Sequence, residues 1–407
     1  MTAARLVLMA LAVGGALLRP WRLPAFLPPV VCAVVAVASG LVPLGAAGHA
    51  LRPLAAPLGF LLAAIPLAVL LDRLGYFEAL AGRFASGRFL VPGLWLLGAG
   101  TVAVLNLDAA VVLLTPLYVR IARRQGCSPR YLGFQPVLLA LLASSFLPVS
   151  NLTNLIVVAR YRVAPWQFLE HLGLPSLVAC IAGYFLYRLV RGAQPFGPEE
   201  GGPAGRAFEG DKEAGRVLLT GSVVVAVVLV GFVLGPPHGV AEWEVALGAD
   251  LVLCVISRQL PWRVIPWRTA LLAAALGVLA ASAASDLHVH ALLSGTGPFA
   301  YLRQAAVSGA GANVVNNLPA LLVALPAVSN GTGHASCALW PVLWGVNAGP
   351  GLLVTGSLAS LLWVDAMGRL GSPVSAGLFL RVGARVVLPA ALVGLAALLL
   401  LAPAVGC

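Results

Sequence analysis

Charged side chains are scarce in this sequence. Asp, Glu, Lys and Arg make up 10% of the 407 residues, whereas a soluble domain carries roughly 25%. Hydrophobic residues make up 60%, and the mean hydropathy is +0.97. The shortage argues against a soluble protein, because a water-exposed surface needs more charge than this. We therefore predict an all-α polytopic membrane protein, with the lipid bilayer as its surroundings.

Clustered basic residues are also lacking. The net charge is +11, and 24 of the 25 basic residues are Arg, with Lys212 the exception. Such a balance can indicate a nucleic-acid partner, but here the arginines are scattered in short loops between apolar runs rather than gathered on one face. We expect no nucleic-acid partner, and we interpret the arginines as determinants of membrane orientation.

Motifs for metal binding and catalysis are missing as well. The six cysteines stand alone, without a CxxC or another metal-ligand spacing, so the sequence indicates neither a disulfide framework nor a metal site. No Ser/His/Asp group or phosphate-binding loop falls at a shared depth in the membrane. We expect no catalytic residues, and therefore no enzyme.

Apolar stretches bounded by Arg, Pro or Gly predict ten membrane spans. They cover residues 5–18, 27–46, 54–71, 134–159, 174–191, 216–235, 244–257, 267–284, 338–364 and 381–402. Two more apolar segments, 89–122 and 297–328, are interrupted near the middle by polar residues. Their arms of about 15 residues are too short for a core of roughly 30 Å, so we predict two re-entrant hairpins.

An acidic, Gly- and Pro-rich segment at 192–215 separates the chain into two halves and predicts a solvated linker. If both hairpins re-enter, 20 of the 25 basic residues fall on one side of the membrane and 5 on the other. The positive-inside rule then places the linker in the cytoplasm and the N-terminus outside the plasma membrane.

The two halves also show weak internal repetition. Residues 104–116 align with 314–326 at an offset of 210, matching Val, Asn, Ala and Pro, and the spans superimpose at nearly the same offset. Five spans and one hairpin are an odd number of crossings, so the second copy must be inverted. We predict two inverted repeats, 1–191 and 216–407, each with five transmembrane helices and one hairpin, an arrangement typical of secondary transporters.

Four polar clusters interrupt the apolar segments at matching places. Two lie at the hairpin tips (106–108 and 313–319), and two break the spans 134–159 and 338–364 (148–154 and 347–360). Gly and Pro interrupt helices and expose backbone groups, while Asn, Ser and Thr supply uncharged donors and acceptors. Such residues also hold membrane helices together. Four clusters at matched positions nevertheless favour a binding site.

Asp108 is the acidic residue of the first predicted tip. The nearest basic residues in the sequence are Arg88 and Arg120. Burial disfavours the charged form of a carboxyl group, so Asp108 could load and release a proton. The structural alternative is a carboxyl that caps the second arm of the hairpin. The two roles are compatible, and we predict that Asp108 couples transport to protons.

Four segments resemble the arsenite efflux permeases of the ArsB type, within the ion transporter superfamily. They are NLDAAVVLLTP (106–116), VSNLTNLIVV (149–158), NVVNNLPALL (313–322) and NAGPGLLVTGSLASLLWV (347–364). The resemblance covers both halves. It implies a cell inner membrane antiporter for arsenical resistance, which exports arsenite or antimonite as the neutral trihydroxide in exchange for protons. No cofactor beyond the proton motive force is expected.

The resemblance also implies which residues line the site. Besides Asp108, the candidates in or next to the polar clusters are Asn106, Asn151, Thr153, Asn154, Asn316, Asn317, Asn347, Thr355, Ser357 and Ser360. Two departures from the family pattern bear on the solute: Leu107 separates Asn106 from Asp108, and Gly351 stands where the family has a lysine. A soluble ATPase partner and the oligomeric state stay open.

Other functions fit the sequence less well. A sodium/proton antiporter of the NhaD type is the close rival, with Asp108 as the cation ligand. A dicarboxylate transporter would carry Ser-Asn-Thr at its tips and would need more cationic help than these clusters offer. A passive channel is a further alternative, although inverted hairpins favour alternating access.

Overall fold

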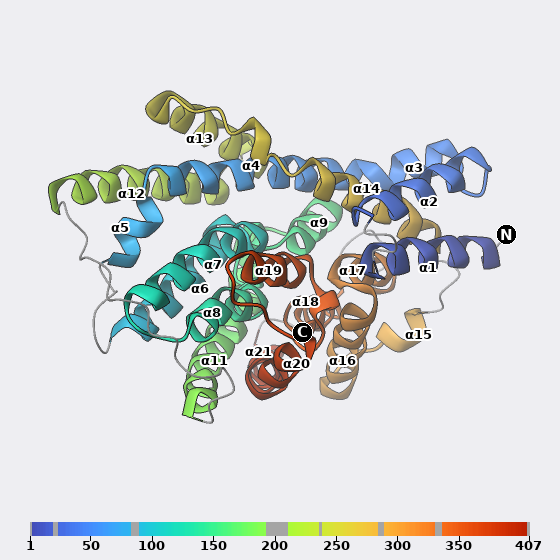
Figure 1. Cartoon of the computed structure of the whole chain (residues 1–407). Helices are drawn as coiled ribbons and strands as arrows, with labels where there is room; N and C mark the ends of the chain where they lie inside the picture. Colours follow the sequence, from blue (N-terminus) through green and yellow to red (C-terminus); the bar gives the residue numbers. More distant parts are fainter. Residues whose placement is uncertain are drawn as a thin grey trace.

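The computed structural model describes residues 2–18, 23–82, 89–192, 211–235, 238–283, 289–329 and 336–404 (Figure 1). Within these residues the chain consists of helices and loops, and the predicted all-α class is confirmed. Most of the predicted linker, 192–215, lies outside the described residues.

The first half contains eleven α-helices. They are α1 (Thr2–Leu18), α2 (Leu27–Ala38), α3 (Leu44–Leu51), α4 (Ala55–Arg73), α5 (Tyr76–Gly82), α6 (Leu90–Leu105), α7 (Leu107–Arg124), α8 (Pro129–Leu142), α9 (Leu152–Tyr161), α10 (Pro165–Phe168) and α11 (Leu174–Gly192). A π-helical segment, Leu169–Gly173, joins α10 to α11.

The second half contains ten α-helices among the residues described. Its α-helices are α12 (Asp211–Leu234), α13 (Glu242–Ser257), α14 (Trp267–Ala283), α15 (His290–Leu293), α16 (Pro298–Val315), α17 (Asn317–Ala324), α18 (Leu339–Ala348), α19 (Leu358–Arg369), α20 (Ala376–Val382) and α21 (Leu388–Leu401). A π-helical segment, Gly383–Val387, joins α20 to α21.

Five helical stretches of the described residues are long and apolar enough to cross a membrane. They are Leu44–Arg73, Pro165–Val190, Gly215–Phe232, Trp262–Ser282 and Ala376–Leu401. Helices α1, α2, α6 and α9 and the stretch Asn317–Val328 are apolar but shorter. The prediction of ten spans also counts shorter and interrupted helices, and it stays a prediction.

One predicted boundary is wrong. The sequence indicates a span over 27–46, but α2 ends at Ala38, and α3 continues through a short 3₁₀ segment into α4. Gly40 adopts a φ of 74°, and Pro43 has no N–H with which to continue α2. Turn chemistry therefore divides an apolar run that hydropathy alone would join.

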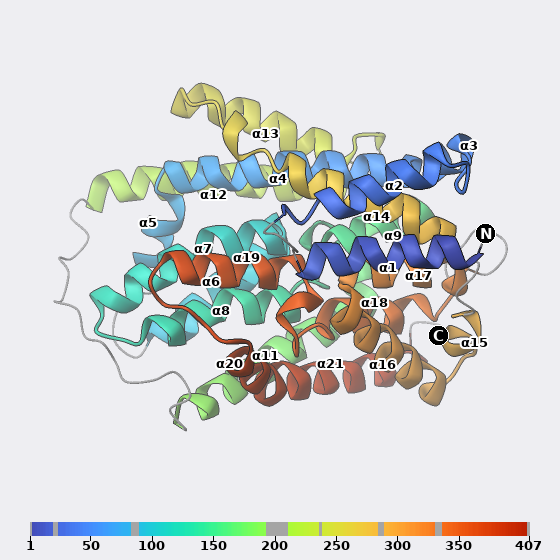
Figure 2. The ribbon, with the colours of Figure 1, turned by 45° about the vertical axis from the view of Figure 1, so that its right-hand side comes forward.

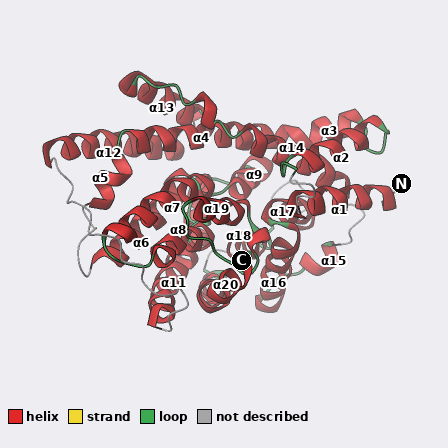
Figure 3. Ribbon diagram, viewed as in Figure 1, coloured by secondary structure: helices red, strands yellow, loops and turns green. Residues whose placement is uncertain are grey.

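The helices lie in two layers (Figures 1 and 2). The peripheral layer comprises α1–α4 and α12–α14, where α4 packs on α13 and α2 packs on α14. The central layer comprises α6–α9, α16–α19, α11 and α21, in which α7 packs on α8, α16 packs on α18, and α11 packs on α21. Helices α4 and α14 connect the layers, because α4 contacts α7 and α9, and α14 contacts α17. All described elements are helix or loop (Figure 3).

Helices α8 and α18 form the centre of the central layer. Each residue of α8 from Tyr131 to Leu142 is buried, and so is each residue of α18. Helices that are hydrophobic on all sides belong in such an interior. The next α-helix along the chain, α9 or α19, starts only after an irregular segment with one short 3₁₀ turn, so both interruptions lie inside the protein.

The two hairpins turn at single asparagines. Asn106, between α6 and α7, has a φ of 113°, and Asn316, between α16 and α17, has a φ of 82°. With ψ values of 146° and 152°, both residues lie close to a backbone region that is almost exclusive to glycine, so each turn is strained. Each carboxamide oxygen also accepts a hydrogen bond from an N–H in the next helix, that of Asp108 at 2.8 Å or Leu318 at 3.3 Å. One residue therefore ends one helix and caps the next.

Cys337 forms a disulfide. The isolated spacing of the cysteines does not indicate a disulfide, so this expectation from the sequence is wrong. The pairing depends on proximity in the fold, which cysteine spacing cannot reveal.

Candidate functional site

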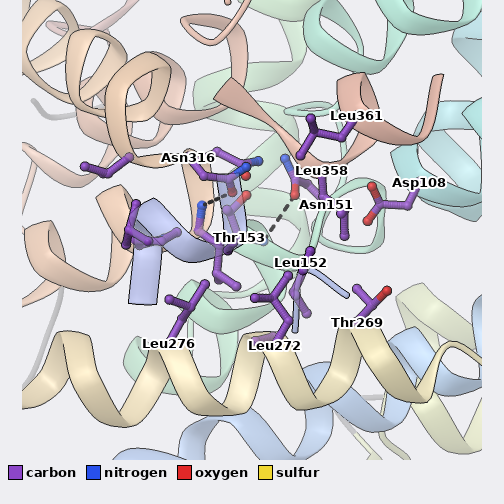
Figure 4. Close-up of a pocket in the computed structure, with 18 of the residues that line it drawn as sticks. Asp108, Asn151, Leu152, Thr153, Thr269, Leu272, Leu276, Asn316, Leu358 and Leu361 are labelled. Carbon is purple, nitrogen blue, oxygen red and sulfur yellow. Dashed lines mark hydrogen bonds between the residues drawn. The ribbon is translucent and has the colours of Figure 1, made fainter. Parts of the chain in front are cut away.

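A small cavity lies where four helices begin. Its volume is about 60 Å³, and it is lined by the first residues of α7, α9 and α17 and the first turn of α19 (Figure 4). The first turn of α9 is capped by Asn151, whose Oδ1 accepts from the Thr153 N–H at 3.3 Å. That of α19 is capped by Ser357, whose Oγ accepts from the Ser360 N–H at 3.1 Å. Together with Asn106 and Asn316, four capped N-termini surround one space.

The cavity includes five of the residues predicted from the sequence. They are Asp108, Asn151, Thr153, Asn316 and Asn317. Figure 4 shows the Asp108 carboxyl turned inward toward Asn151, with Asn316 farther along the pocket. Both hairpin tips and the first broken span therefore contribute polar side chains to one pocket, and the second broken span adds Leu358 and Leu361.

Other predicted residues lie behind this lining. Asn106 is the cap of α7, and the Thr355 carbonyl accepts from Asn316 Nδ2 at 3.1 Å. Ser357 and Ser360 are bonded to each other through their hydroxyls at 2.8 Å. The predicted residues that do not line the cavity are Asn106, Asn154, Asn347, Thr355, Ser357 and Ser360.

Asn347 joins the two broken spans. Its Oδ1 accepts from Asn151 Nδ2 at 3.0 Å and from Thr153 Oγ1 at 2.7 Å. Its Nδ2 donates to Asn154 Oδ1 at 2.7 Å and to Ser145 Oγ at 3.0 Å. Every hydrogen-bonding site of the buried carboxamide is thus used, and two cavity-lining side chains are held in place from behind.

Asn313 stabilises the second break through hydrogen bonds to backbone groups. Its Nδ2 donates to the carbonyls of Gly309 and Gly349, and its Oδ1 accepts from the N–H groups of Leu352 and Leu353. Without such a partner, the backbone groups of the segment after α18 would be left unsatisfied, which is costly inside a membrane protein. Asn313 therefore stabilises an irregular backbone beside the cavity.

Two buried polar groups at the first tip have no hydrogen-bond partner among the described residues. They are Asn106 Nδ2 and Asp108 Oδ1, on side chains that are 1% and 6% exposed. An unsatisfied polar group in such a place costs free energy, so it calls for a ligand, a proton or water. The first tip therefore carries unused binding capacity.

The side wall comes from the peripheral layer, and sequence reasoning missed it. Thr269, Leu272, Ala273 and Leu276 of α14 line the cavity, with Val13 and Ala16 of α1. The spacing of Thr269, Leu272 and Leu276 places them on one helix face. That spacing was readable, but the sequence does not say that this face meets the hairpin tips.

The electrostatics of the cavity combine helix dipoles with one carboxyl group. Four helix N-termini carry partial positive charge toward the space. None of its lining residues is Lys, Arg or His, and Asp108 is the acidic residue among them. Amide and hydroxyl groups can bind a small hydroxylated solute, and the carboxyl group can exchange a proton.

Comparison with known proteins bears on this arrangement. Residues 2–349 match the CitMHS family model, described as citrate transporter. The arsenical pump membrane protein of Yersinia enterocolitica is 26% identical over 405 residues, covering 91% of this chain and 92% of the relative. The protein of the same description from Escherichia coli K12 is 26% identical over 378 residues, covering 83% and 85%.

A solved structure shares the fold. The crystal structure of the Alcanivorax borkumensis YdaH transporter, described as having an unusual topology, matches with a TM-score of 0.59. The match covers 89% of this chain and 87% of that chain at 14% identity. At this identity the likeness concerns the fold alone.

Proposed function

The chain belongs to the CitMHS citrate transporter family, and we propose that this multi-pass membrane protein exports arsenite or antimonite in exchange for protons. The solute would be the neutral trihydroxide. The observation that carries the proposal is the cavity itself, with uncharged amides and hydroxyls, a single carboxyl group and four capped helix N-termini.

The size of the cavity supports a small solute. Its 60 Å³ holds roughly four to six water-sized groups, if each needs about 10–15 Å³. A trihydroxide of arsenic or antimony is of that order, whereas citrate is several times larger and carries multiple negative charges. The absence of Lys, Arg and His from the lining also disfavours a polyanion. The arsenical pump relatives point the same way.

Matched local features support inverted repeats. The caps Asn106 and Asn316 lie 210 residues apart, and the caps Asn151 and Ser357 lie 206 apart. Each half also has a π-helical segment before its last helix. We infer five transmembrane helices and one re-entrant hairpin in each half, with alternating access to the central cavity.

The Cys337 disulfide supports the proposed orientation. Disulfides persist in oxidising compartments such as the periplasm. The positive-inside rule assigns the segment between the second hairpin and α18, where Cys337 lies, to the outer face. Both arguments support the proposed orientation, with the N-terminus outside and the linker in the cytoplasm.

Asp108 is the proposed proton carrier. Its Oδ1 has no partner among the described residues, and its N–H bond to Asn106 holds the residue at the start of α7. In the exchange that we propose, a proton bound from outside neutralises the carboxyl group on the return of the empty site. Solute binding from the cytoplasm then accompanies release of that proton.

A sodium/proton antiporter is the second candidate. The same carboxyl group, with the amide of Asn151 and the hydroxyl of Thr153 in the same lining, offers oxygen ligands to a hard cation. The four helix N-termini oppose this reading, because their partial positive charge disfavours a cation.

Uptake by everted vesicles tests the proposal. We expect arsenite to accumulate in response to a proton gradient, and Asp108→Asn to abolish or uncouple that uptake while expression is retained. Asp250→Asn is the matched control, since Asp250 is a buried carboxyl group of α13 outside the cavity. Sodium-triggered proton movement without arsenite uptake would favour the antiporter. Unchanged pH-dependent arsenite uptake in Asp108→Asn would remove Asp108 from the mechanism.

A further inference from the structure

A second, larger cavity lies beyond the first. Its volume is about 620 Å³. Its walls are the later residues of α9, α14 and α17, the segment from Leu41 to Leu54, and Arg5 of α1. The basic residues Arg5, His49 and Arg160 line it, and no acidic residue does.

Helices α9, α14 and α17 line both cavities. In each helix the earlier residues face the small cavity and the later residues face the large one. On α9, Leu152 and Thr153 face the small cavity and Ile156 the large one. On α17, Pro319 faces the small cavity and Leu322 the large one.

On α14 the change falls between two neighbours, Leu276 and Gly277. About one turn of α9 and of α17 therefore separates the two spaces, whereas α14 passes directly from one space to the other.

The separating turn is apolar and tightly packed. Ile156 is 1% exposed and Leu276 is 4% exposed. Leu322 packs against both hydrophobic clusters of the protein, the one that contains Ile156 and the one that contains Leu276. Leu322 therefore lies between the two clusters, about one turn of α17 beyond Pro319 of the small cavity.

We propose that the large cavity is the outer vestibule of the transport route, and that Leu322, between Ile156 and Leu276, is its apolar gate. A closed apolar constriction excludes water and ions from the binding pocket, whereas its opening would connect the pocket to the outside. The description of this route as a transport route rests on the proposed function. The gate itself depends only on which residues separate the two spaces.

The vestibule opens on the proposed outer side. Arg5 and Arg160 belong to the few basic residues that the topology leaves outside, and both line the vestibule. Arg5 is held there by Nε and Nη2, which donate to the Leu41 carbonyl at 3.1 and 3.0 Å. The hydroxyl of Tyr161 donates to the Leu325 carbonyl and braces the end of α9 against the segment after α17. Opening the gate would require α17 to move against that brace or against α14.

Thiol labelling of intact cells tests the gate. In a cysteine-free background, Ser282→Cys reports on the vestibule and Thr269→Cys on the pocket. The probe is an anionic, membrane-impermeant methanethiosulfonate, which suits a basic vestibule. We expect Ser282→Cys to react from outside and Thr269→Cys to react slowly.

Leu322 is partly buried and packs against both clusters, so its truncation to alanine removes apolar packing from the constriction. We therefore expect Leu322→Ala to raise the labelling rate of Thr269→Cys at least about tenfold. Leu321→Ala is the control, since Leu321 is buried on α17 but lines neither cavity. If Leu322→Ala does not fold, Leu322→Gln keeps the volume, removes the apolar seal and should give the same rise.

Two results would overturn the gate. One is Ser282→Cys reacting only in everted vesicles, and the other is a Thr269→Cys rate that does not respond to either Leu322 substitution. Labelling needs no transported solute, so failure of arsenite uptake with the expected labelling would reject the proposed function and leave the gate intact.

Discussion

The carboxamide of Asn347 offers the sharpest test of how the two broken spans are held together. Hydrogen bonds between membrane helices contribute about 0.6 kcal/mol on average, so its four bonds contribute about 2.4 kcal/mol. Asn347→Ala also leaves the amide of Asn151 and the hydroxyl of Thr153 buried without that partner, at about 1 kcal/mol or more for each. We expect the free energy of unfolding to fall by about 4 kcal/mol.

A pair of threonine substitutions supplies the internal control. Thr153→Val removes one bond of 2.7 Å to Asn347 and should lower the free energy of unfolding by about 1 kcal/mol. Thr115 is equally buried on α7, but its hydroxyl has no partner among the described residues, so Thr115→Val should be neutral or stabilising.

Equilibrium unfolding in mixed detergent–SDS micelles, followed by tryptophan fluorescence, measures these differences. Equal losses for Thr153→Val and Thr115→Val would refute the reasoning, because burial would then matter and the bond would not. So would a loss below about 1 kcal/mol for Asn347→Ala, since four hydrogen bonds cannot contribute so little.

Two further pairs of substitutions test local geometry by thermal stability in detergent. Asn106→Ala should lose about 1 kcal/mol for the missing cap. Asn106→Gly also loses the cap but relieves the strain of a φ of 113° and a ψ of 146°, so it should be close to wild type, and equal losses would contradict this account. Gly383→Ala should destabilise strongly because its Cβ would collide with the Gly351 carbonyl, while Gly368→Ala, with open space around it, should not.

The sequence predicts the interruptions of the helices better than the contacts between them. Asn, Gly and Pro within apolar runs mark turns and caps by local chemistry, and these are the places where α6, α16 and α18 end and where α9 begins. The bonds from Asn347 to Asn151 and Thr153 cross 196 and 194 residues. No local pattern specifies such a contact, so only the fold reveals that Asn347 positions the lining.

For a related reason, the sequence does not predict that α14 forms a wall of the cavity. In a membrane-embedded helix most faces are apolar, so hydrophobic periodicity does not distinguish the side that faces lipid from the side that faces a cavity. Thr269 is a single hydroxyl on such a helix, and its position opposite the hairpin tips depends on how the two layers pack. The polar tips were found because they break the pattern, whereas α14 keeps it.

The two hairpin tips differ in their hydrogen bonds and in their titratable groups. The carboxamide nitrogen of Asn316 is used by the Thr355 carbonyl, which ties the second tip to the second break. The equivalent nitrogen of Asn106 has no partner among the described residues, and next to it lies the unpartnered oxygen of Asp108. The second half has Leu318 at the place of Asp108 and so offers no titratable group there. The chemistry of exchange should therefore be concentrated at the first tip, while the second tip acts as the fixed surface against which the solute is held.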